Sequence, residues 1–448
     1  MSGKKSPRFF RVGAPVLALA AASLLSAVDA QAQTVSKDPI TFSKHIAPIF
    51  QKSCQTCHRP DSIAPMALMN YADARPWARS IKQKVSMREM PPWYIERNVG
   101  VQKFINDPSL TDDEIAMIVK WVDGGAVQGN PADMPPPRTF ENDRWTIGTP
   151  DLIVSNPVEV TVPAVGADWW PEWTVDSGLT EDRWIKAVEI KPSPGGQKVV
   201  HHAGASAIFP GGDDDDDTGQ RGGGQLTEYA VGKNADINPD GTARLIKAGS
   251  KIRFSFHYHS IGEEIKDRSQ VAFKFYPRDY KPKYELVRMH VGDNFDTLDI
   301  PAGTSNARSD GYMVLQKPIM LTGFQPHMHN RGTRMCMEAI FPDGRIETMS
   351  CAKHNFAWMI VYNYAEDVAP LLPAGTILHT IGWHDNTTAN KYNPDPRNWT
   401  GFGNRSIDDM SFAWTSWIVL PDDEFKARVA ARRAAAPKLS NSTANNNN

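Results

Sequence analysis

The sequence has little that suits a membrane protein, a nucleic-acid-binding protein or a helical bundle. After residue 28, no stretch approaches the roughly 18 apolar residues that a membrane-spanning helix requires. No long basic run occurs, which argues against a nucleic acid or an anionic membrane surface as a partner. Long amphipathic stretches are few, whereas 34 prolines and 32 glycines punctuate the chain. These features predict mostly β structure without stable membrane insertion.

The chain has 448 residues, which is enough for about three domains. Apolar residues make up 41% of it and include 13 tryptophans and 18 phenylalanines, so hydrophobic cores can form and wholesale disorder is excluded. The formal net charge is −2, and without the first 32 residues 45 basic and 50 acidic residues remain. The body of the protein is therefore mildly acidic.

The first 32 residues have the pattern of an export signal. A basic stretch ends at Arg11, an apolar segment follows over residues 12–28, and Ala-Gln-Ala at 30–32 supplies a cleavage site. A permanent anchor is the alternative, but the segment is short, rich in alanine and interrupted by Pro15, so it would span a bilayer poorly. The absence of an Arg-Arg pair favours the general secretory route. We therefore predict a signal peptide over residues 1–32 and export to the periplasm.

Two of the four cysteines belong to a motif with a specific chemistry. Cys54, Cys57 and His58 form a Cys-x-x-Cys-His sequence, which is the signature of c-type haem attachment. The two thiols form thioethers to the haem vinyl groups, and the adjacent histidine ligates the iron. A thioredoxin-like pair would explain neither His58 nor the export signal. The motif predicts one covalently bound haem c.

Residues 38–130 are predicted to form one helical unit around this motif. Apolar residues recur at helical spacing over residues 46–50, just before the motif. A second helix is expected to begin at Thr111, which makes a capping box with Glu114, and to end at Gly124. A haem-attachment helix followed by such a C-terminal helix resembles the small monohaem class of cytochrome c.

The second axial ligand of the haem iron is expected to be Met90. It precedes Pro91 and follows His58 by 32 residues, which resembles the distal loop of cytochrome c, where the proline presents the sulfur. Ligation by one histidine and one methionine would raise the haem potential, as suits a periplasmic electron carrier. Methionine is also common core material, and this interpretation suits Met66, Met69 and Met117. The other methionines of the unit are Met66, Met69, Met87 and Met117.

A proline-rich linker over residues 131–145 separates this unit from a region of different pattern. Short β-rich runs separated by turn residues then predict a sandwich or jelly-roll architecture. The tail over residues 430–448 is of low complexity and is predicted to be disordered. The clearest expected strands are residues 151–154, 184–190, 251–258, 270–276 and 377–383.

The remaining two cysteines flank a predicted hairpin. Pro-Asp-Gly at residues 342–344 separates two apolar-rich runs. With a two-residue turn at 343–344, Cys336 lies opposite Cys351, and an oxidising compartment then favours a disulfide. A three-residue turn with a glycine bulge would shift the register by one and place the cysteines on opposite faces. We expect the disulfide.

Histidines cluster in the C-terminal two-thirds of the chain. In a strand, residues i and i+2 project from the same face, so a His-x-His sequence can chelate one metal ion. Neighbouring histidines alternate faces and therefore need a strand end or a bulge to do so. Surface or core-edge histidines are the alternative for any single cluster, but three clusters are hard to attribute to chance. The clusters are His201-His202, His257-x-His259 and His327-x-His329, with His384 as a single residue.

Ligand chemistry narrows the choice of metal. Imidazoles alone allow zinc, copper, iron or nickel, whereas a thioether partner selects copper, especially Cu(I). No cysteine is free for zinc if the disulfide forms, and no His-Glu-x-x-His sequence occurs. Copper in an oxidising compartment, in the same chain as a haem, suggests that the protein takes part in a redox reaction.

The order and spacing of these motifs across about residues 150–425 resemble the copper type II, ascorbate-dependent monooxygenases. This is the family of peptidylglycine α-hydroxylating monooxygenase and dopamine β-monooxygenase. The similar segments are Val199-Val200-His201-His202, Phe254-Ser255-Phe256-His257-Tyr258-His259, Pro326-His327-Met328-His329 and Asp408-Asp409-Met410.

The resemblance implies two jelly-roll-like β-sandwich domains, over residues 146–290 and 291–425, each with one copper ion facing a solvent-filled cleft. The first copper, which stores an electron, would be held by His201, His202 and His257, with His259 as the alternative to His257. The second copper, where O2 binds and substrate is hydroxylated, would be held by His327, His329 and Met410.

The activity implied by the resemblance is hydroxylation of an aliphatic C–H bond of a small organic substrate with O2. The fused haem c suggests that electrons from a periplasmic donor reach the three-histidine copper through the haem. The alternative is a non-catalytic periplasmic protein that transfers electrons or handles copper. Two unlike metal centres favour the enzyme, because storage does not require them.

Overall fold

The structure is a computed structural model that describes residues 39–435 with several gaps. The undescribed positions in this range are 61, 63, 106, 141–144, 213–222, 232, 234 and 293–296. The predicted signal peptide lies outside the described residues, as do residues 436–448 of the predicted tail.

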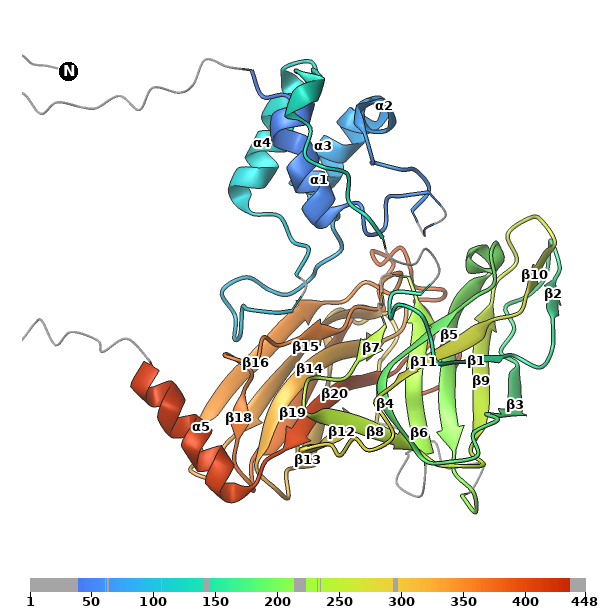
Figure 1. Ribbon diagram of the computed structural model, residues 1–448, viewed down its shortest axis with the longest axis vertical. Coiled ribbons are helices and arrows are strands. Elements are labelled where there is room, and N and C mark those ends of the chain that lie inside the picture. Colours follow the sequence, from blue (N-terminus) through green and yellow to red (C-terminus); the bar gives the residue numbers. More distant parts are fainter. Residues whose placement is uncertain are drawn as a thin grey trace, which may run out of the picture. The chain divides into compact units, whose positions relative to one another are not determined.

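The N-terminal part is helical and has a small core of its own. Rings of Phe42, Phe50 and Trp121 contact one another there, with centroids 5.9–6.4 Å apart. Thr111 and Glu114 form the predicted capping box, and Gly124 caps the end of that helix. The elements are η1 (Phe42–Ile46), α1 (Ala47–Ser53), α2 (Tyr71–Ala74), η2 (Arg75–Trp77), α3 (Ala78–Ser86), α4 (Asp112–Asp123) and η3 (Pro131–Asp133) (Figure 1).

Residues 93–105 depart from the prediction that residues 38–130 form one unit. Phe104 is buried in the core of the second β-sandwich rather than in the helical core. Glu96 accepts hydrogen bonds from Nε and Nη2 of Arg334 at 2.6 and 2.9 Å. The apolar side chains of this segment bury their surface against the larger β core. The helical unit is therefore interrupted by a segment that belongs, by packing, to the C-terminal region.

The first sandwich packs one sheet against another around a single core. Apolar residues on one face of each strand drive this packing. On strand β9 (Lys251–Tyr258), Ile252, Phe254 and Phe256 alternate with polar residues and all three are buried. One layer is formed by β3 (Glu172–Asp176), β9, β5 (Val200–Ile208) and β6 (Gly223–Ala230). The other contains β1 (Leu152–Ser155), β11 (Gln270–Phe275), β4 (Arg183–Lys191), β7 (Asp236–Ile237) and β8 (Thr242–Ile246). β2 (Val160–Val162) pairs with β10 (Ile265–Asp267), and η4 (Gly196–Lys198) precedes β5.

The second sandwich has the same two-layer construction around a separate core. One layer contains β12 (Tyr284–Val291), β20 (Ser411–Val419), β14 (Ile319–Met328), β17 (Tyr362–Asn363) and β18 (Leu371–Leu372). The other is formed by β13 (Ala307–Val314), β19 (Ile377–His384), β15 (Gly332–Ile340) and β16 (Ile346–Lys353). The described residues therefore form a mainly β protein with several sheets, as the composition predicts.

The two sandwiches share one sheet, and the boundary between them differs from the predicted one. β12 pairs antiparallel with β20 and its Tyr284 and Val291 lie in the second core, so this strand belongs to the second sandwich. The predicted boundary at 290/291 was therefore too late, and the change falls before Tyr284. β12 also pairs in parallel with β8 of the first sandwich, which joins the two sheets edge to edge. A pairing between strands so far apart in sequence leaves no local pattern from which to predict it.

Buried ion pairs also stabilise the junction between the two sandwiches, where β8 and β12 pair. Asp236 on β7 accepts a hydrogen bond from Arg288 on β12 at 2.9 Å and pairs with Lys233 at 2.6 Å. Burial alone would raise the pKa of Asp236, but Arg288 and Lys233 outweigh it and hold that pKa far below the ordinary value. The ionised carboxylate therefore stabilises the junction.

Asp236→Asn is expected to lower the free energy of unfolding by about 2 kcal/mol at neutral pH. A depressed folded-state pKa gives stability above the ordinary aspartate pKa of about 4, and that stability is lost as the pH falls through the folded-state value. The difference between wild type and variant in urea unfolding should therefore be constant from about pH 5 to about pH 7 and shrink below about pH 4. A difference that grows on acidification would contradict this assignment.

The hairpin between β15 and β16 carries the predicted disulfide, Cys336–Cys351. The turn is of the three-residue kind, because Phe341 and Arg345 close it and Gly344 has φ +84°. Such a turn alone would shift the register by one residue and place the two cysteines on opposite faces of the hairpin. An extra residue, Met349, bulges from β16 and restores the register, so that Cys336 pairs with Cys351. The disulfide fits an oxidising compartment.

The C-terminal helix α5 (Asp422–Ala435) corrects the predicted start of the disordered tail. The helix continues through residues 430–435, because alanine and arginine are strong helix formers and the acidic first turn and basic last turn suit the helix dipole. Figure 1 shows α5 at the C-terminal end of the chain. Arg428 and Arg432 bind it to the second sandwich: Arg428 donates to Glu366, and Arg432 donates to the backbone oxygens of residues 366 and 369.

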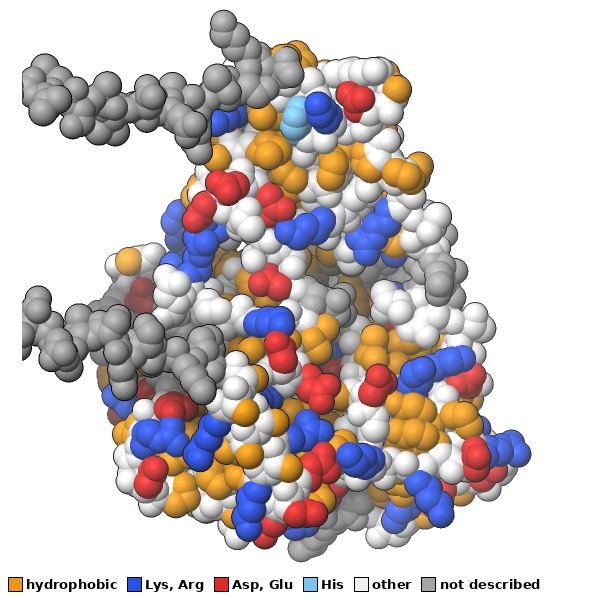
Figure 2. Space-filling view, turned by 60° about the vertical axis from the view of Figure 1, so that its left-hand side comes forward, with side chains coloured by type: hydrophobic (Ala, Val, Ile, Leu, Met, Phe, Trp, Pro, Cys, Tyr) orange, Lys and Arg blue, Asp and Glu red, His pale blue; other side chains and the backbone are white. Residues whose placement is uncertain are grey.

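None of the helices among the described residues is both long and apolar enough to cross a membrane. On the face in Figure 2, basic and acidic side chains are interspersed with small hydrophobic patches.

Candidate metal centres

The first histidine set lies where two neighbouring strands of the first sandwich meet. His201 and His202 stand near the start of β5, and His257 stands near the end of β9. The register between these strands shifts between Val200 and His202, so His201 is the extra residue of a β-bulge. Neighbouring residues of a regular strand point to opposite faces. The bulge interrupts this alternation, so His201 and His202 can both face one metal ion.

The geometry of this set fits a single metal ion. One ring nitrogen from each of His201, His202 and His257 lies within 4.8 Å of the other two. The Nδ1 atoms of His201 and His202 are 3.2 Å apart. Two nitrogens that bind one tetrahedral ion at about 2.0–2.1 Å lie about 3.3 Å from each other. Nδ1 of His257 is buried and has no hydrogen-bond partner among the described residues, which fits an atom that binds a metal ion.

Asp168 contacts both His257 and His259, but only His257 belongs to the cluster. Nε2 of His257 donates to Oδ2 of this carboxylate at 2.8 Å, which leaves Nδ1 to face the other two histidines. Nδ1 of His259 donates to Oδ1 at 2.7 Å, but its side chain is 61% exposed and lies outside the cluster. Trp170 stacks on the His257 ring, with centroids 4.7 Å apart. The structure thus brings His257 into the set and leaves His259 at its edge.

These imidazoles are neutral at neutral pH, as metal ligation requires. Burial, with a smaller contribution from the neighbouring His257, lowers the pKa of His201 to about 4. Burial likewise lowers the pKa of His202 and of His257. Their lone pairs are therefore free for a metal ion without prior loss of a proton.

Asp168→Asn is expected to weaken metal binding at this set by about 10- to 100-fold, because the amide no longer fixes the His257 tautomer. The measurement is a Cu(II) titration of the metal-free protein. Glu263→Gln is a matched control, since Glu263 pairs with the exposed Lys198 and not with a histidine of the set. Equal affinity in Asp168→Asn and wild type would show that Asp168 does not orient the histidine.

The second histidine set lies at the end of β14. His327 is the penultimate residue of β14, and His329 is the first residue after the end of that strand. Met328 pairs with Ser411 and His327 with Phe412 on β20, so Met410 occupies the next register position, opposite His329. Nδ1 of His327 is buried and finds no hydrogen-bond partner in the described part of the chain. Two histidines and one methionine therefore meet at neighbouring strand ends, and their joint role as ligands stays a prediction.

Asp409 organises the backbone around this second set. Its buried carboxylate accepts hydrogen bonds from the backbone N–H of His329 at 2.9 Å, of Met410 at 2.9 Å and of Arg331 at 3.1 Å. Burial alone would raise the pKa of Asp409, but its interactions with His384, 3.5 Å away, and with His329 lower that pKa to about 2. A single carboxylate thus ties both strand ends that carry the predicted ligands.

Sequence reasoning missed the roles of Asp168 and Asp409. Asp409 had a signal, because it directly precedes Met410 in a motif already singled out. Asp168 had none, since it lies 89 residues from His257 in sequence. His384 is fully buried and its Nε2 lies 3.3 Å from Met410 O and 3.5 Å from Oδ1 of Asp409, so it supports the second set.

The haem-attachment motif lies at the end of α1. Nδ1 of His58 donates to the backbone oxygen of Met66 at 3.1 Å, which orients the ring and leaves Nε2 for an iron ion. Cys54 and Cys57 form no disulfide. Burial raises the pKa of Cys54 to about 12, the opposite of what an activated thioredoxin-like cysteine needs. Met90 lies after α3, and its role as the second iron ligand stays a prediction.

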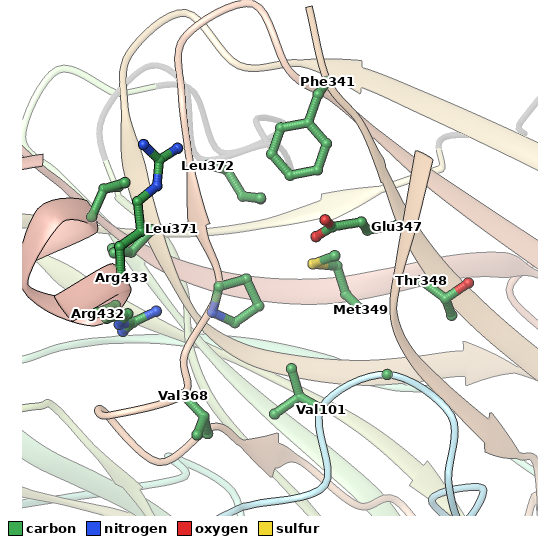
Figure 3. Close-up of a pocket in the computed structure, with 13 residues that line it drawn as sticks. Val101, Phe341, Glu347, Thr348, Met349, Val368, Leu371, Leu372, Arg432 and Arg433 are labelled. Atoms are coloured by element: carbon green, nitrogen blue, oxygen red, sulfur yellow. The ribbon is translucent and has the colours of Figure 1, made fainter. Parts of the chain in front are cut away.

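A pocket of about 600 Å³ lies elsewhere, between α5, β16 and β18. Leu371 and Leu372 lie on one side of it and Glu347 and Met349 on the other, with the α5 arginines nearby (Figure 3). No histidine is among the described residues that line this pocket, so it forms no part of either histidine set.

Comparison with known proteins gives no family assignment. No protein-family model matches the chain, and no curated protein sequence matches it. Among solved structures, the chain is similar to allantoicase at 11% identity, over 48% of this chain and 75% of that one, with a TM-score of 0.16. It is also similar to the VP2 subviral particle of infectious bursal disease virus at 12% identity, over 63% and 74%, with a TM-score of 0.17. A variant oxalate decarboxylase of Bacillus subtilis is 8% identical over 67% and 87%, with a TM-score of 0.13. Scores this low carry no argument about fold or function.

Proposed function

We propose that the protein is a periplasmic, copper-dependent monooxygenase that hydroxylates an aliphatic C–H bond of a small organic substrate. The observation that carries the proposal is the convergence of His201, His202 and His257 on one metal-sized space, with a second, unlike set at the end of β14. The overall reaction consumes O2, two electrons and two protons, and it releases the alcohol and water. Copper would supply the one-electron chemistry and O2 reactivity of this reaction, and haem c would relay the electrons.

The chain's own residues have distinct tasks under this proposal. His201, His202 and His257 hold one copper ion, and Asp168 fixes the tautomer of His257. The resemblance assigns His327, His329 and Met410 to the copper ion at which substrate reacts. Asp409 holds these strand ends in place.

The haem group would be held by the helical unit. Cys54 and Cys57 would attach it, His58 would bind the iron through Nε2, and Met90 would complete the coordination. A periplasmic donor would reduce it. Export also agrees with the Cys336–Cys351 disulfide.

Met410→Ile is expected to abolish substrate-dependent O2 uptake while leaving the haem spectrum unchanged, because isoleucine retains the volume but lacks the thioether. The measurement is copper-dependent O2 uptake with a panel of small aliphatic compounds. Met87→Ile is the matched control, since Met87 is 60% exposed and outside both sets. Activity that survives in Met410→Ile would overturn the methionine assignment. Two bound copper ions without any substrate-dependent O2 uptake would favour the electron-transfer or copper-handling alternative.

A further inference from the structure

The loop between β16 and β17, residues 354–361, contacts two other regions of the chain. Nδ2 of Asn355 donates to the hydroxyl of Tyr94 at 3.2 Å, in the segment that follows Met90. The backbone N–H of Met359 donates to the carbonyl of Val231 in the first sandwich at 3.2 Å. The loop itself belongs to the second sandwich. It is therefore anchored on both sides of the junction between the histidine sets.

Phe356 in this loop contacts one member of each set. Its ring stacks on His201 with a centroid distance of 5.1 Å and an interplanar angle of 26°. The same ring meets His329 at 5.9 Å and 75°, an edge-to-face contact. A phenyl ring has no donor or acceptor, so it can neither bind a metal ion nor replace a ligand. Its position between the two sets therefore requires another explanation.

We propose that Phe356 is a positioning residue that fixes the separation of the two histidine sets and keeps water from between them. This inference rests on the proposed function. The family resemblance implies a solvent-filled cleft between the two sets, whereas here one aromatic ring lies against a histidine of each. Charges interact more strongly across an apolar ring than across water. A ring held from both sandwiches therefore couples the sets more tightly than an open cleft would.

The first test needs no metal. His201 and His329 of the metal-free protein should react slowly with diethyl pyrocarbonate, because Phe356 covers them, and severalfold faster in Phe356→Ala. The exposed His259 is the internal reference and should react equally in both proteins. Phe356→Tyr should restore the protection, and Trp77→Ala, in the helical unit at a site 44% exposed, is the control for loss of an unrelated ring. Unchanged rates at His201 and His329 in Phe356→Ala would overturn the proposal.

Folding is checked separately. Phe356→Leu keeps apolar volume and should give an intermediate rate, and the near-ultraviolet circular dichroism of each variant should match that of wild type. If Phe356→Ala does not fold, the comparison of Phe356→Leu with wild type decides, and equal rates would again overturn the proposal.

The second test uses the protein loaded with Cu(II). The wild type should show one defined dipolar interaction between two Cu(II) ions by electron paramagnetic resonance, and Phe356→Ala should show a weaker and broader one at the same copper content. The same interaction in both proteins would overturn the role of Phe356. Failure to bind two copper ions would overturn the proposed function instead, and the modification rates would still decide whether Phe356 covers both sets.

Discussion

Asp409→Ala should lower the free energy of unfolding by about 3–5 kcal/mol and abolish copper binding at the proposed second site. The variant leaves three backbone N–H groups without their acceptor in a buried environment, and each such loss is costly. The strand ends that carry His329 and Met410 would then no longer be held together. Urea unfolding and copper content per chain measure the two effects.

The neighbouring carboxylate supplies the control for this variant. Asp408 pairs through its side chain with Arg405, whose side chain is 59% exposed. Asp408→Ala should therefore cost less than about 1 kcal/mol and leave copper binding intact. Equal destabilisation by the two substitutions would show that Asp409 has no special structural role.

The double variant Cys54→Ser, Cys57→Ser should carry no covalently attached haem. Serine is close to cysteine in size but cannot form a thioether, so haem should dissociate from the denatured chain. The measurement is haem staining after denaturing electrophoresis, with protein exported in cells that attach c-type haem. The β-sandwiches have cores of their own, so copper content should stay unchanged.

A single-residue control separates attachment from iron ligation. His58→Ala keeps both thiols and should retain covalent haem with an altered absorption spectrum. Covalent haem in the double cysteine variant would contradict the assignment of the motif.

Local patterns predicted much of this structure. Short β-rich runs separated by turn residues located β9 and β19 to within one residue, because the residues that favour strands and those that favour turns are both local signals. The capping box located the start of α4 for a similar reason, because its two hydrogen bonds are local. The paired histidines at 201 and 202 indicated a strand end or a bulge, and the structure has a bulge there.

Contacts between distant residues were beyond such reasoning. The pairing of β8 with β12 and the packing of residues 93–105 on the second sandwich depend on partners that no local period identifies. The disulfide was predicted correctly although the turn was not of the assumed kind, because the bulge at Met349 compensated for the longer turn. The sequence around Phe356 did not indicate its role either, because no local pattern distinguishes an aromatic loop residue that contacts a functional site from one that does not.

The most direct test of the account is the number of copper ions and haem groups per chain, measured by elemental analysis and the alkaline pyridine spectrum on exported protein. The account predicts two copper ions and one haem in wild type, with one copper ion lost in His202→Ala. One haem with no tightly held copper would contradict the copper centres and leave a haem protein fused to β-sandwiches of another function.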